Sequence, residues 1–177
     1  MTHVDAIEQL YGAAAGRLGA YGYVLTGSQA AGEELVQEAI VKVFVRRRRL
    51  DNATMAEAYV RTTMRNLYVD RLRRDRTWKR LLPREAQPEQ RSDDSELVAT
   101  RDAVAVALRT LPDQVRTAVV LRYLDDLGVA EVAAEMNLAE GTVKRYLSDG
   151  RALLAPLLGT DDHDTAAKVA VVEGVRR

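Results

Sequence analysis

The residues best suited to chemistry in this sequence are arginines and lysines gathered in one stretch. Residues 42–80 hold thirteen basic and four acidic residues, whereas residues 1–41 hold one basic and five acidic residues. The formal net charge of the chain is zero because such blocks cancel. A basic block of this density is typical of a surface that binds nucleic-acid phosphates, and a solvated helix face is the alternative.

Groups that would support catalysis or metal binding are sparse. The sequence has no cysteine and only two histidines, His3 and His163, so disulfides and thiolate zinc sites are excluded. No glycine-rich phosphate loop, nucleophile–base pair or metal-ligand motif can be read from the sequence. We therefore expect a protein that is not an enzyme, with no catalytic residue, no metal site and no cofactor.

The spacing of apolar residues predicts helices along most of the chain. Hydrophobic residues make up 47 % of the sequence and aromatic residues 5 %, a mix that favours helices over sheets. Apolar residues recur at intervals of three or four, which is the helical period. The predicted apolar stripes include Leu18 and Tyr21 in the first helix, Leu35 in the second, and Ala58 and Val60 in the third. The predicted helices are 4–25, one that begins after Ser28, 55–76, 97–108, 112–124, 128–136 and 140–154.

These helices predict an all-α fold of two small helical domains. The first covers residues 4–80, because its three amphipathic helices need one another to bury their apolar stripes. Residues 81–96 contain two prolines and much charge, which indicates a flexible linker. The second domain covers 97–158, and 159–177 form a C-terminal tail.

The sequence gives no sign of export or membrane insertion. The N-terminus lacks a basic segment followed by an apolar run, so it does not read as a signal peptide. No apolar stretch approaches the roughly 20 residues needed to cross a bilayer. A cytoplasmic protein is expected.

A helix-turn-helix is predicted at 127–148, which reads LGVAEVAAEMNLAEGTVKRYLS. Two short helices meet across a turn at Asn137, a residue type that tolerates the left-handed conformation at a helix end. In this motif the second helix enters the major groove of DNA. The motif alone does not separate initiation factors from repressors or other regulators.

Two segments together resemble one family. EELVQEAIVKVF (33–44) with AYVRTTMRNLYVDRLRR (58–74) resembles region 2 of extracytoplasmic-function (ECF) sigma factors, which direct bacterial RNA polymerase to promoters. Residues 111–154 resemble region 4 of the same family. The resemblance covers most of residues 5–155 in the family's order and implies two contacts with promoter DNA, one at each of the −10 and −35 elements.

The resemblance implies a role for specific residues in each domain. Residues of the LVQE stretch would dock on the clamp helices of the polymerase β′ subunit, and region 4 would meet the β flap. The implied core-binding residues are Glu34, Gln37, Glu38 and Lys42. The implied −10 residues are Tyr59, Arg61, Arg65, Asn66, Asp70, Arg71, Arg73 and Arg74. In the family a flipped base is held there, and Asn66 would read it, whereas Tyr59 could equally be a core aromatic.

The second DNA contact is implied for Arg122, Thr142, Lys144, Arg145, Ser148 and Arg151. Here the sequence departs from the family, which often reads S-R-A-R where this chain has Ser148-Asp149-Gly150-Arg151. Asp149 should repel phosphate or accept from a cytosine amino group. Gly150 should weaken the helix by up to ~1 kcal/mol relative to alanine. Weak −35 binding or a bent helix is expected.

The resemblance and the residue patterns also indicate further partners and leave alternative functions open. Most relatives are held inactive by an anti-sigma factor, so such a partner is expected beside core polymerase and promoter DNA. The main alternative is a one-component helix-turn-helix regulator with an N-terminal sensing domain. A nonspecific packaging protein is a weaker rival, because it would not need the acidic linker.

Overall fold

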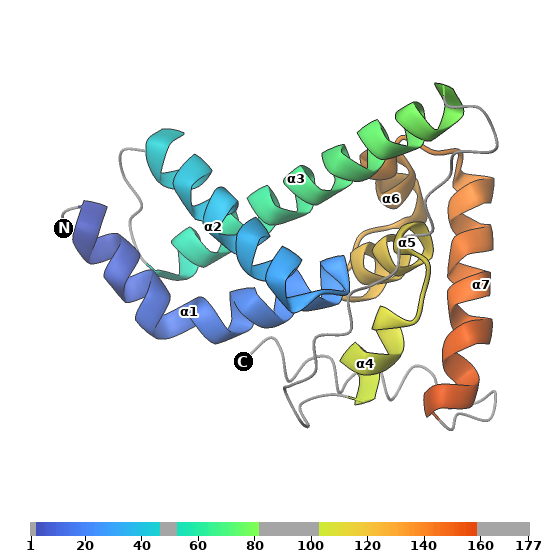
Figure 1. Cartoon of the computed structure of the whole chain (residues 1–177), viewed down its shortest axis with the longest axis horizontal. Helices are drawn as coiled ribbons and strands as arrows, with labels where there is room; N and C mark the ends of the chain where they lie inside the picture. The colour runs from blue at the N-terminus through green and yellow to red at the C-terminus, as the bar shows by residue number, and fades with distance from the viewer. Residues whose placement is uncertain (1–2, 47–52, 82–102, 159–177) are drawn as a thin grey trace. The chain divides into compact units, whose positions relative to one another are not determined.

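The computed structural model describes residues 3–46, 53–81 and 103–158, and these form seven α-helices with no strand among them (Figure 1). The all-α prediction is confirmed. Contacts divide the chain within its third helix into two compact units, Met1–Tyr68 and Val69–Arg177. The predicted domain boundary near residue 80 remains a prediction. The proposed linker, except Leu81, and the C-terminal tail lie outside the described residues.

The first unit is built from α1 (His3–Thr26), α2 (Gln29–Arg46) and the N-terminal half of α3 (Ala53–Leu81). Each helix contributes one buried stripe, as the periodicity predicted. The fully or almost fully buried side chains are Ala14, Leu18, Tyr21, Leu25, Leu35, Ala39, Val43, Ala56, Val60 and Met64. Ala58 was expected in the α3 stripe, but it is exposed and Ala56 takes the core position.

A tight turn and a close helix crossing set the geometry of α1 against α2. Gly27 has φ 76° and donates its backbone N–H to the Tyr23 carbonyl at 2.7 Å. Ser28 then caps α2, since its Oγ accepts from the Ala31 N–H at 3.4 Å. Gly22 and Gly32 face each other where the helices cross, and a Cβ on Gly32 would lie 2.7 Å from the Gly22 carbonyl carbon. Only glycine lets the two backbones approach so closely.

The second unit contains the predicted helix-turn-helix. Its helices are the C-terminal part of α3, α4 (Ala103–Arg109), α5 (Asp113–Tyr123), α6 (Val129–Met136) and α7 (Glu140–Leu158). The helix predicted to end near Leu154 continues to Leu158, with Pro156 in its last turn. The buried core comprises Leu108, Leu111, Val115, Ala118, Val120, Leu121, Val132, Ala133, Met136, Val143 and Leu147.

The turn between α6 and α7 has the predicted left-handed residue. Asn137 has φ 51° and ψ 57°, and the next backbone N–H, that of Leu138, donates to the Ala133 carbonyl at 2.9 Å. At the start of α6, the Glu131 carboxylate accepts from the Gly128 N–H at 2.7 Å. Both ends of this short helix are therefore fixed, which holds α7 at a defined angle.

The described residues include neither a cluster of metal ligands nor a membrane-spanning helix. Within these ranges, no group of three or more His, Asp or Glu side chains is placed to hold a metal ion. None of the helices described is long and apolar enough to span a membrane.

Candidate nucleic-acid interface

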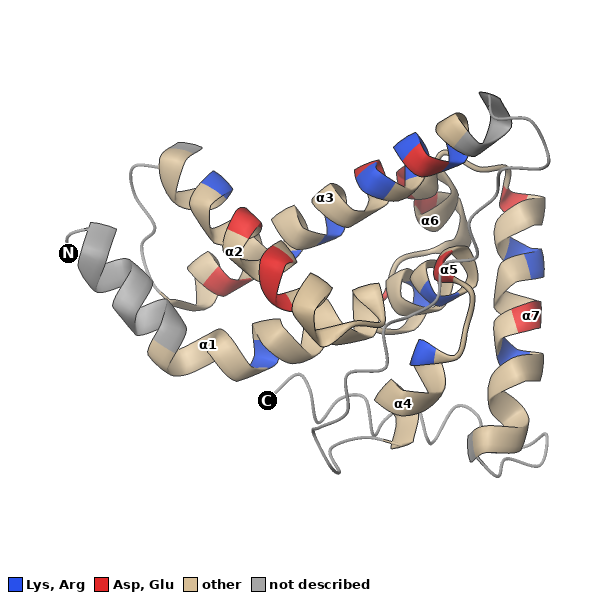
Figure 2. Cartoon of the chain, in the orientation of Figure 1, with Lys and Arg blue, Asp and Glu red and all other residues tan. Residues whose placement is uncertain are grey.

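Lys42 and Arg46 of the basic block lie on α2, and the arginines of the block on α3 fall on different faces of that helix. Figure 2 shows Lys and Arg concentrated in the C-terminal half of α3. Among the residues predicted to meet the −10 element, Asn66, Asp70 and Arg74 are exposed. The others are half-buried, namely Tyr59, Arg61, Arg65, Arg71 and Arg73. The structure therefore separates an exposed set, Asn66, Asp70 and Arg74, which we call the outward row of α3, from half-buried residues that also pack against other side chains.

Arg61 belongs to the second group. Its guanidinium carbon lies 4.2 Å from the centre of the Tyr21 ring of α1, a cation–π contact. Nearby, Arg17 donates to both Glu57 carboxylate oxygens, from Nε at 2.8 Å and from Nη2 at 2.7 Å. This pairing raises the pKa of Arg17 above its ordinary value through the hydrogen bonds and the charge of Glu57. Both contacts join α3 to α1 and hold the first unit together.

Two arginines at the C-terminal end of α3 contact the end of α6 within the second unit. Arg73 donates through Nη2 to the carbonyls of Ala134, at 3.1 Å, and Glu135. Arg76 donates in the same way to the carbonyls of Met136 and Asn137, at 3.1 Å each. The last carbonyls of a helix lack partners within it and carry partial negative charge, so arginines suit them.

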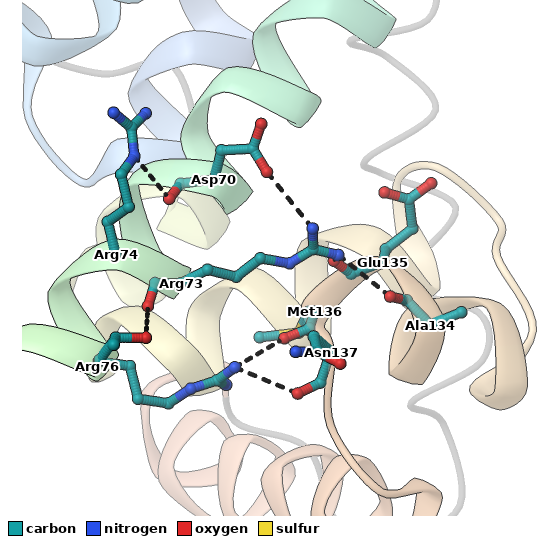
Figure 3. A network of polar contacts seen from close by, with 9 residues as sticks. Asp70, Arg73, Arg74, Arg76, Ala134, Glu135, Met136 and Asn137 are labelled. Carbon is teal, nitrogen blue, oxygen red and sulfur yellow. Dashed lines mark hydrogen bonds and ion pairs between the residues drawn. The ribbon is translucent and has the colours of Figure 1, made fainter. Parts of the chain in front are cut away.

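Arg74 lies apart from that network. Figure 3 shows its guanidinium pointing away from Ala134 and Asn137, whereas Arg73 and Arg76 extend toward them. Its Nε donates to the Asp70 carbonyl of its own helix at 3.2 Å. Because Arg74 is exposed, its other N–H groups can reach a phosphate. Among Arg73, Arg74 and Arg76, Arg74 is the one whose side chain is exposed.

The face of α2 predicted to dock on polymerase is exposed and includes two residues that sequence reasoning missed. Glu34 and Gln37 are exposed, and Glu38 and Lys42 are half-buried. Val41 and Val45 lie on the same side at helical spacing and are 63 % and 77 % exposed. The sequence identifies both residues as apolar, but only the structure places them on the surface. Exposed valines beside polar groups are typical of a protein-contacting patch.

The second candidate DNA-contacting surface is the outer face of α7. Lys144, Arg145, Ser148 and Arg151 are exposed there, and Thr142 is half-exposed. Lys144 lies only 4.0 Å from Glu140, a weak surface ion pair. Val143, Leu147 and Gly150 form the opposite, buried face. The predicted recognition residues therefore share one solvent-facing surface.

Arg122, predicted to join this contact, also supports the loop before α6. Its Nη1 donates to the Leu127 carbonyl at 3.3 Å and lies 3.9 Å from Asp126. Asp126 itself adopts φ 56°, an uncommon conformation for a residue other than glycine. Arg122 thus stabilises the loop that leads into the helix-turn-helix.

The two residues that depart from the family pattern have different surroundings. Asp149 is exposed beside Arg145 and Ser148, so its negative charge lies next to the residues predicted to contact DNA. Gly150 is buried, and a Cβ there would lie 2.7 Å from Val119 Cγ2 and 3.2 Å from Val115 Cγ1. The helix continues through Gly150 to Leu158. The glycine is therefore a close-packing residue between α7 and α5, a role that helix propensity did not indicate.

Removing the charge of Asp149 should strengthen binding to duplex DNA. Exposed charge pairs contribute up to about 1 kcal/mol, so Asp149→Asn is expected to tighten binding up to about fivefold at low salt. The gain should shrink at high salt, because screening weakens exposed charges. The measurement is a fluorescence-anisotropy titration of a −35 duplex. Glu33→Gln, which removes one exposed charge from α2, is the control and should leave affinity unchanged. Weaker binding by Asp149→Asn would instead indicate that the carboxylate accepts from a base.

Two known families match successive parts of the chain. The sigma-70 region 2 family matches residues 10–78, and the sigma-70 region 4 family matches residues 101–154. Similar proteins include the ECF RNA polymerase sigma factor SigL of Mycobacterium tuberculosis, 32 % identical over 80 % of this chain and 82 % of that protein. RNA polymerase sigma-E factor of Streptomyces antibioticus is 31 % identical, covering 76 % and 74 % of the two chains.

Two further comparisons differ in how much of each chain they cover. ECF RNA polymerase sigma factor SigE of Mycolicibacterium smegmatis is 31 % identical over 81 % of this chain, but the chain spans only 58 % of that protein's length. Among solved structures, the sigma factor RpoE of Bartonella quintana, crystallised with the anti-sigma factor NepR, has a TM-score of 0.51. That likeness covers 88 % of this chain and 98 % of the other at 22 % identity, and it supports the fold.

Proposed function

The chain belongs to the ECF RNA polymerase sigma factors of the sigma-70 family, and we propose how its surfaces divide the work of initiation. The exposed face of α2 binds core polymerase, the outward row of α3 opens and reads the −10 element, and α7 reads the −35 duplex. The protein acts as a regulatory factor, without chemistry of its own, in the cytoplasm beside the polymerase.

One observation carries this proposal most directly. Each matched family region contains an exposed helix surface that includes arginine or lysine, with Arg74 on α3 in the first region and Lys144, Arg145 and Arg151 on α7 in the second. A chain with two separate DNA-facing helices suits a promoter that offers two elements. A one-component regulator would need only the helix-turn-helix and would have an effector site in the other unit.

The −10 role rests on the outward row of α3. Asn66 offers an amide that can both donate to and accept from a base edge. Arg74 offers a guanidinium for the neighbouring phosphates. Promoter opening needs such a combination, because a base that leaves the stack loses its pairing and must gain new contacts on the protein.

The polymerase contact rests on α2. We propose that Val41 and Val45 pack against an apolar surface of core polymerase, with Glu34, Gln37, Glu38 and Lys42 forming its polar surround. Burying valine side chains favours binding by about 1.5–3 kcal/mol each when burial is complete. The polar residues would orient the helix and reject other partners.

Replacing Val41 by aspartate tests this contact. A charge in an apolar interface is costly, so Val41→Asp should weaken core binding about tenfold or more. Val106→Asp is the matched control, because Val106 is a 57 % exposed valine on α4 and lies outside the proposed surface. Affinities for purified sigma-free core polymerase, measured by biolayer interferometry, would decide between them. Equal losses in both variants would remove the α2 face from the proposal.

Control of the protein by an anti-sigma factor is part of the same proposal. The RpoE neighbour was solved with such a factor bound. Here the exposed surfaces of α2 and α7 are the surfaces that an inhibitor must cover to block polymerase and DNA. We therefore expect an anti-sigma factor to compete with core polymerase, so that binding of the chain to core polymerase falls as the concentration of the anti-sigma factor rises.

The proposed function is tested by mixing the purified chain with sigma-free core polymerase. A stable complex on size-exclusion chromatography, which then binds promoter DNA, is expected. Tight binding to a duplex operator by the chain alone, with no core complex, would favour the one-component regulator.

A further inference from the structure

A row of exposed residues on α7 continues past the predicted recognition surface toward the end of the helix. Leu153 and Leu157 are 48 % and 53 % exposed, and Asp149, one turn before them, is exposed as well. These three residues are four positions apart, so their side chains lie along one side of the helix, which we call the α7 ridge. The ridge is therefore acidic at one end and apolar at the other.

The sequence that follows α7 has the complementary order. Residues 159–164 read GTDDHD, a composition typical of a turn. Residues 166–175 read AAKVAVVEGV, of which seven are alanine or valine, and Arg176 and Arg177 come next. A segment that folds back along α7 after the turn meets the two leucines first and Asp149 last. Its apolar run then lies on the leucines, and its arginines lie at the aspartate.

The length of this segment suits such a path. Leu157 and Asp149 are separated by eight helical positions, which is about 12 Å along the axis of α7. Residues 166–176 would cover about 15 Å as a helix and about 33 Å as an extended strand. In either conformation the segment is long enough to contact both ends of the ridge at once.

We propose that residues 165–177 dock on the α7 ridge, with the apolar run covering Leu153 and Leu157 and with Arg176 and Arg177 paired with Asp149. The inference goes beyond the proposed function, and its test needs neither DNA nor polymerase. It also accounts for an aspartate where the family often has an arginine. Two arginines from the segment restore positive charge beside the recognition residues.

The size of the apolar patch favours a tethered segment over a separate protein. The exposed fractions of Leu153 and Leu157 together amount to about one leucine side chain. Stable interfaces between separate proteins bury about 1,200–2,000 Å² in total, far more than one leucine offers. A segment joined to the end of α7 is held at an effective concentration in the millimolar range, so a small contact is enough to hold it.

Trypsin cleavage of the full chain measures this contact, because Lys168 is the only lysine or arginine between Arg151 and Arg176. Cleavage within a docked segment follows the population of the undocked form. A variant with both Leu153→Asp and Leu157→Asp should be cleaved at Lys168 about tenfold faster than wild type or more, since charges disfavour apolar contacts. Met55→Asp, which changes an exposed apolar residue of α3, is the control and should be cleaved at the wild-type rate. Mass spectrometry of the fragments gives the rates.

A charge-swap series tests the pairing with Asp149. Asp149→Arg should speed cleavage at Lys168 about fivefold at low salt, the range of an exposed ion pair, and less at high salt. Adding Arg176→Asp and Arg177→Asp to Asp149→Arg should restore slow cleavage, because the charges are then exchanged. Failure of the combined variant to recover would contradict the pairing. If the leucine variant unfolds at a lower temperature by circular dichroism, this series decides alone.

A synthetic peptide of residues 159–177 gives the cleavage rate of an undocked segment. The wild-type chain should be cleaved at Lys168 at least tenfold more slowly than the peptide, at a rate independent of protein concentration. Equal rates for chain and peptide, or for wild type and the leucine variant, would overturn the proposal. Protection that grows with protein concentration would also overturn it, because a second copy would then cover the ridge. Promoter-specific transcription is measured separately, so the proposed function can hold or fail whichever result is found.

Discussion

Alanine in place of Gly32 is expected to destabilise the first unit by about 3 kcal/mol, the upper part of the usual range for overpacking. A Cβ at this position would lie 2.7 Å from the Gly22 carbonyl carbon and 2.8 Å from the Tyr23 backbone nitrogen. These atoms belong to the α1 backbone and cannot turn aside as a flexible side chain can. The helices would have to separate, which would expose Leu35 and Leu18 of the shared core.

Gly16→Ala is the matched control, and its expected effect has the opposite sign. No atom lies within 4 Å of a Cβ built on Gly16, which is exposed on α1. Alanine there should stabilise the helix by about 0.5–1 kcal/mol. Urea unfolding of both variants, followed by circular dichroism, gives the two free-energy changes. If Gly32→Ala is as stable as wild type, the close crossing of α1 and α2 is wrong.

Loss of the Asn66 amide is expected to reduce promoter opening about tenfold or more. A good pair of hydrogen bonds to a base contributes about 1–3 kcal/mol of discrimination, and Asn66 is exposed on the outward row of α3. Because the contact is made only to a base that has left the duplex, Asn66→Ala should spare binding to closed DNA. The expected signature is a defect in opening at nearly normal affinity for the duplex.

Permanganate reactivity of unpaired thymines, measured beside duplex affinity, separates the two steps. Thr62→Ala is the control, because Thr62 is also exposed and lies one helical turn before Asn66 on α3. It should leave both measurements within about twofold of wild type, as surface changes usually do. If Asn66→Ala reduces duplex binding and opening equally, the base-reading role is refuted.

The helical architecture was largely predictable because a buried stripe at helical spacing is a strong signal. Leu18, Tyr21, Leu35 and Val60 were assigned to stripes and are buried. The turn at Asn137 was predictable for a different reason, since few residues accept a left-handed conformation. Where two neighbouring alanines could occupy the stripe, as at Ala56 and Ala58, periodicity chose the wrong one. Small side chains carry little hydrophobic signal.

Contacts between residues that are far apart along the chain could not be predicted from the sequence alone. Gly150 was predicted only to weaken its helix, and nothing in the sequence indicated the close approach of Gly22 to Gly32; the structure shows that a side chain would clash at all three positions. Arg116 is 3 % exposed and donates to the Leu111 carbonyl at 3.0 Å and to Asp113 at 2.6 Å. Arginine is usually a surface residue, so no local pattern predicts this burial.

The candidate surfaces were predicted in part. Resemblance to the family chose the residues of α2, α3 and α7, and the structure places many of them on exposed faces. It also distinguishes their surroundings, since Arg61 stacks on Tyr21 and Arg73 contacts α6 whereas Arg74 points away. Val41 and Val45 were missed because no local pattern distinguishes an exposed valine that contacts a partner from other valines outside the buried stripe. Their exposure became visible only in three dimensions.

Promoter-dependent transcription by a defined polymerase tests the central claim most directly. Sigma-free core polymerase would be incubated with fragments of bacterial genomic DNA, with and without the purified chain, and the 5′ ends of the transcripts sequenced. We predict discrete start sites that appear only with the chain and share two upstream elements at constant spacing. Start sites unchanged by the chain, or no transcripts despite a stable core complex, would contradict its assignment as an initiation factor.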